Sequence, residues 1–185
     1  MRKILVTITG ASGSIYALKM LDLLRDHEVE VHAIISDAGR QVLQWETGLE
    51  VARLEGVDRW HEVSNLAAPP ASGSAGFDAM VVIPCTMGTL GAISNGLSNN
   101  LIHRAADVIL KERKPLILAV RETPLNRTHL RNMLQAEESG AVIFPCMPAL
   151  YNRPSSLDEM ALNFAARVCE FIGLPVASMP RWQGE

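Results

Sequence analysis

Short apolar runs alternate along the chain with segments in which apolar residues recur at helical spacing. Five runs have the length and composition of buried parallel strands, at Lys3–Ile8, Val29–Ile35, Ala79–Ile83, Leu116–Val120 and Ala141–Phe144. Between them, the helical period predicts amphipathic helices over residues 15–25, 38–48, 104–114, 126–138 and 155–171. This alternation predicts a three-layer α/β sandwich around a mainly parallel sheet.

The remaining stretches have weaker patterns. Residues 49–64 predict only a short helix followed by an irregular segment, and the segment Ala67–Gly76, rich in Ala, Pro and Gly, is predicted to be a mobile loop. Small apolar residues from Leu90 to Leu97 predict a helix that packs closely against a flat surface or another subunit. We expect one domain over residues 1–185, with a tail from about residue 176.

Polar turns follow four of the predicted strands directly, at residues 9–14 (TGASGS), 36–37 (SD), 85–89 (CTMGT) and 121–122 (RE). Because the carboxyl ends of parallel strands meet at one edge of a sheet, these turns are expected to line a ligand site there. The first turn offers backbone N–H groups and a helix N-terminus to an anion. It has neither GxGxxG spacing nor a Walker lysine, which favours a single phosphate. A tight βα turn without a ligand is the alternative.

The stretch from Arg104 to Glu122 combines a helix and a strand with charged residues. At about 100° per residue, Arg104, Asp107 and Lys111 share one arc of the helix, opposite its apolar residues. Pro115 ends the helix, and the charged pair Arg121-Glu122 follows the next strand. These charges are candidates for a binding site, and a solvated helix face with a loop salt bridge is the alternative.

Composition and charge exclude several classes of protein. The 185 residues carry a net charge of −3 and 48% are apolar, which argues against disorder and against nucleic-acid binding. Three cysteines without CxxC spacing suit free thiols in a reducing cytosol, and the five histidines show no metal-ligand spacing. The apolar stretch before Gly10 is too short for a signal peptide or a membrane span. We therefore expect a cytoplasmic protein with no metal, membrane or nucleic-acid partner.

Seven segments, in order, resemble the UbiX family of flavin prenyltransferases: GASGSIYA, SDAGRQVL, ASGS, PCTMGTL, RAADVILKERKPLILAVRETPL, PALYNRP and RWQG. The resemblance covers nearly the whole chain and implies a Rossmann/flavodoxin-like flavoprotein. It implies transfer of a dimethylallyl group from dimethylallyl monophosphate to N5 and C6 of reduced FMN, without a metal. The product, prenylated FMN, serves UbiD-type decarboxylases. The family also implies a homo-oligomer, expected to be a dodecamer, with sites shared between neighbours.

The resemblance also implies a set of site residues. Those matching FMN contacts are Gly10, Ala11, Ser12, Ser36, Thr86, Met87, Gly88, Thr89 and Arg121. Those matching the prenyl phosphate site are Tyr151 and Arg167, with Arg104, Lys111 and Glu122 expected in the same pocket. Ser12, Glu46 and Trp182 match positions that shape the active site. Thr86 stands where many relatives have serine, which keeps the hydroxyl.

These residue types suit the implied chemistry. Fixed cations stabilise a departing phosphate, each by a few kcal/mol, and no aspartate-rich motif is present to hold a metal. Trp182 could stabilise an allylic cation, and either Glu122 or the phosphate itself could act as base. Structural roles remain open for several residues: a surface carboxylate for Glu46, an interface anchor for Trp182, a packed turn for Tyr151.

Two other functions compete with this one. An FMN-dependent cysteine decarboxylase would share the fold and the FMN site, but its PASANT and PxMNxxMW motifs are missing, and PCTMGT stands in place of the first. A non-catalytic, FMN-holding subunit of a decarboxylase is the other. It would bind a larger partner stably and show no turnover alone.

Overall fold

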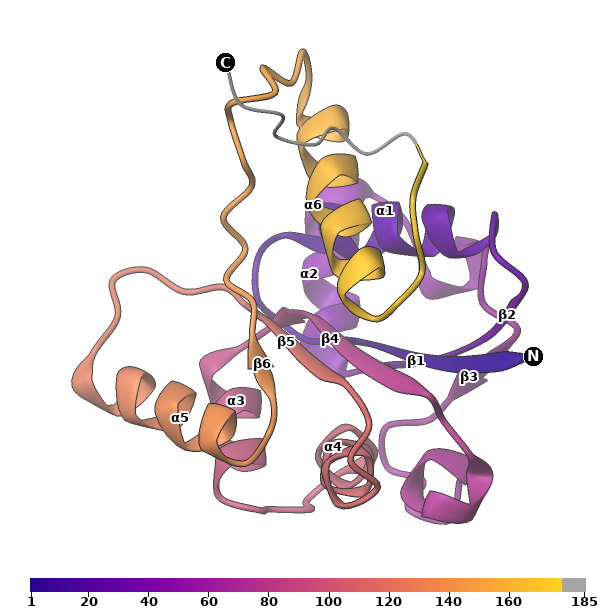
Figure 1. Cartoon of the computed structure of the whole chain (residues 1–185), viewed down its shortest axis with the longest axis vertical. Helices are drawn as coiled ribbons and strands as arrows, with labels where there is room; N and C mark the ends of the chain where they lie inside the picture. The colour runs from indigo at the N-terminus through magenta and orange to yellow at the C-terminus, as the bar shows by residue number, and fades with distance from the viewer. Residues whose placement is uncertain (178–185) are drawn as a thin grey trace.

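A computed structural model of the chain describes residues 1–177, and its strands form one parallel sheet. The six strands lie in the order β3-β2-β1-β4-β5-β6 (Figure 1). They are β1 (Arg2–Ile8), β2 (Val29–Ile35), β3 (Arg59–His61), β4 (Ala79–Cys85), β5 (Leu116–Val120) and β6 (Val142–Ile143). The strand order reverses between β1 and β4, which is the point where ligands bind in sheets of this kind. We call the edge formed by the carboxyl ends of the strands the rim.

Helices cover both faces of the sheet, which confirms the predicted three-layer sandwich (Figure 1). One face carries α1 (Ser14–Leu24), α2 (Asp37–Thr47) and α6 (Leu157–Phe171). The other carries α3 (Met87–Ser94), α4 (Leu101–Lys111) and α5 (Arg127–Glu138). Helix α3 begins earlier than its apolar pattern predicts, because the Thr86 side chain caps it and recruits the CTMGT turn into the first helical turn.

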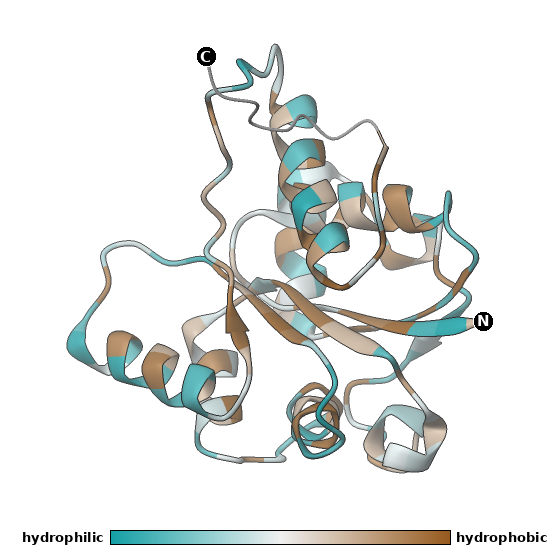
Figure 2. Ribbon diagram, in the orientation of Figure 1, coloured by the Kyte–Doolittle hydropathy of each residue, from teal (hydrophilic) through white to brown (hydrophobic). Residues whose placement is uncertain are grey.

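The apolar runs form strands because both faces of the sheet are buried. Ile4, Val6 and Ile8 of β1 point into the core under α1 and α6, while Leu5 points into the opposite core. The strands are mostly hydrophobic, apart from polar residues such as those at the start of β1 (Figure 2). A sheet buried on both faces leaves its edges for chemistry.

Two segments differ from the sequence-based expectations. Residues 49–64 contain the 3-10 helix η1 (Val51–Arg53) and the three-residue strand β3, too short to leave a periodic signal. The expected mobile loop at 67–76 contains two more 3-10 helices, η2 (Pro69–Ala71) and η3 (Gly73–Ala75). They pack against α4 because Ala68 and Pro70 are buried there.

Candidate functional site

Three helices begin at the rim, each at the turn that follows a strand. Ser36 caps α2 by accepting the N–H of Gly39 at 3.0 Å, and Thr86 caps α3 by accepting the N–H of Thr89 at 3.1 Å. A helix leaves its first four N–H groups without intrahelical partners, and each of these caps satisfies one. The amides of the first residues of α2 and α3 therefore point at the space beyond the rim, where they favour an anion.

A buried threonine ties the first and third turns together across the switch point of the sheet. The Thr9 hydroxyl donates to Pro84 O at 2.7 Å and accepts the N–H of Thr86 at 2.9 Å. Thr9 is almost fully buried, so these bonds fix the CTMGT turn against β1. Thr9 was not among the residues expected at the site, although a polar residue directly after a buried strand and before a glycine turn was an available signal.

Glycines bring the first two turns into close contact and leave the third one open. A Cβ atom on Gly10 would lie 2.5 Å from Ala38 Cβ, and one on Gly39 would lie 2.8 Å from Ile8 O. A Cβ on Gly88, by contrast, would meet only the Thr86 hydroxyl oxygen, at 4.0 Å. The start of α3 thus presents bare backbone to open space.

The N-terminus of α1 already has its anion. Glu46, at the end of α2, accepts the Gly13 N–H at 3.0 Å and the Ser14 N–H at 2.8 Å. Burial raises the pKa of Glu46, but hydrogen bonds from Ser12, Ser14 and Gly13 outweigh burial and hold that pKa below its ordinary value. We expected an external phosphate at this turn, but the Glu46 carboxylate accepts these two N–H groups in the structure.

Arg121 and Glu122 follow β5 at the rim, as expected. The Arg121 N–H donates to Cys85 O at 3.1 Å, which extends the pairing of β4 and β5. A pocket of about 310 Å³ opens at this point, lined by Arg121, Glu122 and Thr123 and by six less polar residues: Val120, Leu125, Met133, Pro145, Cys146 and Met147. Burial raises the pKa of the Cys146 thiol to about 12 and that of Cys85 further, so neither is a nucleophile.

Tyr151 and Arg167 lie on the part of the chain that follows β6. Residues 144–156 run away from the sheet to the start of α6 (Figure 1), and Tyr151 on this segment is more than half exposed. Arg167 lies on α6, where its Nη1 is 3.3 Å from a Glu170 carboxylate oxygen. Trp182 lies outside the described residues.

Arg104 and Lys111 do not join Arg121 and Glu122 within one chain. Arg104 donates to Ala71 O at 3.1 Å and to Asp107 at 2.7 Å, and Lys111 pairs with Glu112 beside Gly73. Both cations thus contact the 69–75 segment, which leads into the amino end of β4. The amino end of β4 lies at the end of the sheet opposite the rim.

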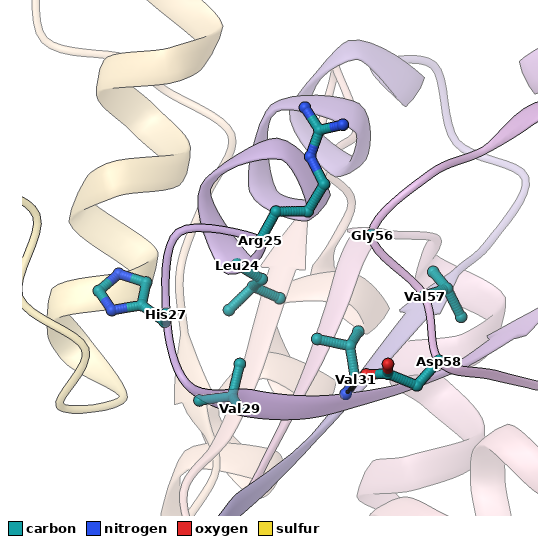
Figure 3. A pocket seen from close by; sticks show the side chains of 8 residues that line it. All are labelled: Leu24, Arg25, His27, Val29, Val31, Gly56, Val57 and Asp58. Atoms are coloured by element: carbon teal, nitrogen blue, oxygen red, sulfur yellow. Dashed lines mark hydrogen bonds between the residues drawn. The ribbon is translucent and has the colours of Figure 1, made fainter.

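A further pocket, of about 290 Å³, opens at the edge opposite the rim (Figure 3). It is lined by Leu24, Arg25, His27, Val29, Val31, Gly56, Val57 and Asp58. The Asp58 carboxylate points at the backbone of β2 and accepts the Val31 N–H at 2.7 Å. None of the residues expected at the site lines this pocket.

Residues 1–177 include no group of three His, Cys, Asp or Glu side chains placed to hold a metal ion. None of their helices combines the length and apolar character that crossing a bilayer requires.

The donor set of the rim fits FMN. Two helix N-termini and the hydroxyls of Ser36, Thr86 and Thr89 suit a phosphate, and the bare backbone at Gly88 admits a flat ring. Residues 1–166 match the family model described as Flavoprotein, so fold and rim together define a flavoprotein.

Comparison with known proteins identifies the branch of that class. Flavin prenyltransferase UbiX of Escherichia coli (strain K12) is 45% identical over the full length of both chains. The structure of AnUbiX (PadA1) with FMN and dimethylallyl pyrophosphate superposes with a TM-score of 0.97 at 40% identity, covering 100% of this chain and 98% of the other. A dodecameric FMN-dependent UbiX-like decarboxylase from Escherichia coli O157:H7 gives 0.95 at 38% identity, with 98% and 100% covered. The chain belongs to the UbiX flavin prenyltransferase family.

Proposed function

We propose that this chain transfers a dimethylallyl group from dimethylallyl monophosphate to N5 and C6 of reduced FMN, without a metal. The observation that carries this proposal is the similarity, over all of the chain, to a protein whose structure holds FMN and dimethylallyl pyrophosphate. The product is prenylated FMN, and a UbiD-type decarboxylase is the partner that uses it. We also propose that the chain forms a single FMN-binding domain. Its place of action in this proposal is the cytoplasm.

FMN is held at the rim in this proposal. Its phosphate lies at the N-termini of α2 and α3, near Ser36, Thr86 and Thr89, because Glu46 closes the N-terminus of α1. The ring lies along Gly10, Ala11, Ser12, Met87 and Gly88, and contacts Arg121. Bound and reduced, FMN supplies the electron-rich N5 and C6 atoms that accept the prenyl group.

The prenyl phosphate is held by cations from more than one chain. Arg121 lies at the rim of a given chain, whereas Arg104 and Lys111 lie beside the 69–75 segment, away from it. We therefore propose a homo-oligomer, a dodecamer in keeping with the UbiX-like relative, in which a neighbour supplies Arg104 and Lys111. With Tyr151 and Arg167, these groups stabilise the departing phosphate as its negative charge grows.

Carboxylates and one aromatic residue complete the proposed machinery. Glu122 lines the rim pocket and exchanges protons near the flavin, with the released phosphate as the rival base. Glu46 and Ser12 line a third pocket, of about 420 Å³, at the start of α1, where they shape the active site. Trp182 is assigned to the stabilisation of the allylic cation.

One experiment tests this function directly. The purified protein is incubated without oxygen with reduced FMN and dimethylallyl monophosphate, and the flavin is recovered for its absorption spectrum and mass. A flavin heavier by one five-carbon unit is expected. Glu122→Gln should lose most of the product, whereas Glu138→Gln, an exposed carboxylate on α5, should not.

The same preparation separates the competing functions. Release of CO₂ from a pantothenoyl or peptidyl cysteine, with unmodified flavin, would establish a cysteine decarboxylase instead. Stable binding of FMN and of a decarboxylase, with neither reaction, would establish an accessory subunit.

A further inference from the structure

Tyr16 is an aromatic residue whose ring is held on two sides at the start of α1. Its ring packs against Phe164 of α6, with the ring centres 4.7 Å apart, and Phe164 in turn packs edge-on against Phe144 at 5.4 Å. On the other side lies Gly13, where a Cβ atom would be 3.0 Å from Tyr16 Cδ2. Gly13 has φ +117°, so this position favours glycine twice, for its backbone and for the ring beside it.

The hydroxyl of this tyrosine has no hydrogen-bond partner in the described part of the chain. Tyr16 is half-buried and its hydroxyl is not one of the buried unpaired side-chain atoms, so the hydroxyl is accessible to a ligand. Within residues 1–177, the Tyr16 hydroxyl makes no hydrogen bond, although its ring is fixed. Burial and the nearby Cys146 raise its pKa, which the Arg121 guanidinium opposes, so the phenol remains a protonated donor at neutral pH.

The position of the hydroxyl relates it to the proposed phosphate site. Cys146 lies beside the end of β5, because its N–H donates to Val120 O at 2.9 Å, and Arg121 is the next residue of that strand end. The Tyr16 ring is linked to the same segment through Phe164, which packs on Phe144, two residues before Cys146. Arg167 follows Phe164 by one turn of α6, on a neighbouring part of the helix surface.

We propose that the Tyr16 hydroxyl donates a hydrogen bond to a phosphate oxygen of the bound dimethylallyl phosphate, beside the Arg121 guanidinium. This contact rests on the proposed function. A phenol O–H without a partner among the described residues suits an anionic oxygen, and a hydrogen bond to a charged group is stronger than one between neutral groups. A purely structural role would use the ring alone and leave the hydroxyl without effect.

Tyr16→Phe removes the hydroxyl and keeps the ring that packs on Phe164. The test measures binding by calorimetry to protein loaded with oxidised FMN, so that no transfer takes place. Because a hydrogen bond to a charged group contributes about 1.5–3 kcal/mol, the dissociation constant of dimethylallyl monophosphate should rise about tenfold or more. FMN affinity, thermal stability and the weak binding of dimethylallyl alcohol, which lacks the phosphate, should stay as in the wild type.

Two results would overturn the contact. One is an unchanged dissociation constant for dimethylallyl monophosphate in Tyr16→Phe. The other is an equal loss of affinity for FMN or for the alcohol, which would assign the hydroxyl to the ring or to the prenyl chain. The proposed function fails separately, if the wild type binds the prenyl phosphate but leaves reduced FMN unmodified.

Discussion

The Glu46 carboxylate accepts the backbone N–H of Ser14 at 2.8 Å, which joins the last turn of α2 to the first residue of α1. A negative charge at a helix N-terminus is stabilised by the helix dipole and by otherwise unpaired N–H groups. This carboxylate also lies in a pocket with Ser12 at the rim. The same side chain is thus a helix cap and, in the proposed function, part of the active site.

Glu46→Gln separates these two roles. Loss of the charge at the cap should lower the free energy of unfolding by about 1 kcal/mol. The Glu46 pKa is depressed in the folded protein, so its contribution is complete above about pH 4.5 and is lost as the pH falls through the folded pKa. Urea unfolding at pH 7 and at pH 3.5 checks this: the difference between the two proteins should shrink at the lower pH.

The activity of the same variant supplies the second readout. Prenylation should fall by at least a hundredfold at pH 7, far more than the small loss of stability explains. Glu28→Gln, in the exposed turn between α1 and β2, serves as the control and should change neither quantity. Full activity in Glu46→Gln would leave the carboxylate with the structural role alone.

Gly88 and Gly10 offer a matched pair for testing the flavin position. Gly88→Ala adds a methyl group with no neighbour closer than 4.0 Å, so it should not destabilise the fold and should add helix propensity of about 0.5–1 kcal/mol. If the flavin approaches the bare backbone there, its dissociation constant should rise at least tenfold. Gly10→Ala meets Ala38 Cβ at 2.5 Å and should lower the melting temperature itself. Fluorescence titration with FMN measures the loss of affinity, and thermal melts measure the loss of stability. Unchanged FMN affinity in Gly88→Ala would place the flavin ring elsewhere.

Apolar patterning predicted the architecture because each long strand is buried on both faces. A fully apolar run such as Leu116–Val120 is typical of a strand inside a parallel sheet that is buried on both faces. The turns that follow such strands meet at the carboxyl edge of the sheet. The rim turns were therefore placed correctly from sequence. Strand β3 was not predicted, because three residues are too few to show an alternation of apolar and polar positions. The strand forms because it pairs with β2.

The contacts missed at the site are long-range. Thr9 meets Pro84 across 75 residues, and Glu46 meets Gly13 across 33. Helical spacing correctly put Arg104 and Lys111 on one side of α4, but it carries no information about which part of the molecule that side faces. The direction that this side of α4 faces is set by the packing of α4 against η2. In the proposed function, the complete site depends on the contacts between chains of the oligomer.

A buried histidine pair away from the rim predicts how stability depends on pH. His32 Nδ1 lies 2.8 Å from His61 Nε2, and His32 Nε2 lies 2.7 Å from a Glu30 oxygen. Burial first, and then His32 and Arg59, lower the pKa of His61 from 6.5 to about 4. The folded state therefore binds fewer protons than the unfolded chain between these values.

The free energy of unfolding should consequently fall as the pH drops from 6.5 towards 4, by about 1.4 kcal/mol per pH unit from this one group. In His61→Gln, which keeps an acceptor for His32 but does not titrate, the fall should be less steep by about that amount. Urea unfolding at half-unit steps between pH 4.5 and 8 measures both slopes. Parallel curves for the two proteins would contradict a depressed pKa at His61.

Mixed oligomers test whether a neighbour supplies Lys111. Lys111→Ala and Glu122→Ala should each lose most prenylation activity, while Lys114→Ala, a neighbouring lysine paired with Asp78, should retain it. If the two residues of one site come from different chains, co-assembly of the two inactive variants in equal amounts restores about a quarter of the sites. The mixture is made by co-expression with two affinity tags, and only doubly tagged oligomers are assayed. If both residues came from one chain, every site in the mixture would lack one of them and activity would stay at the level of the single variants.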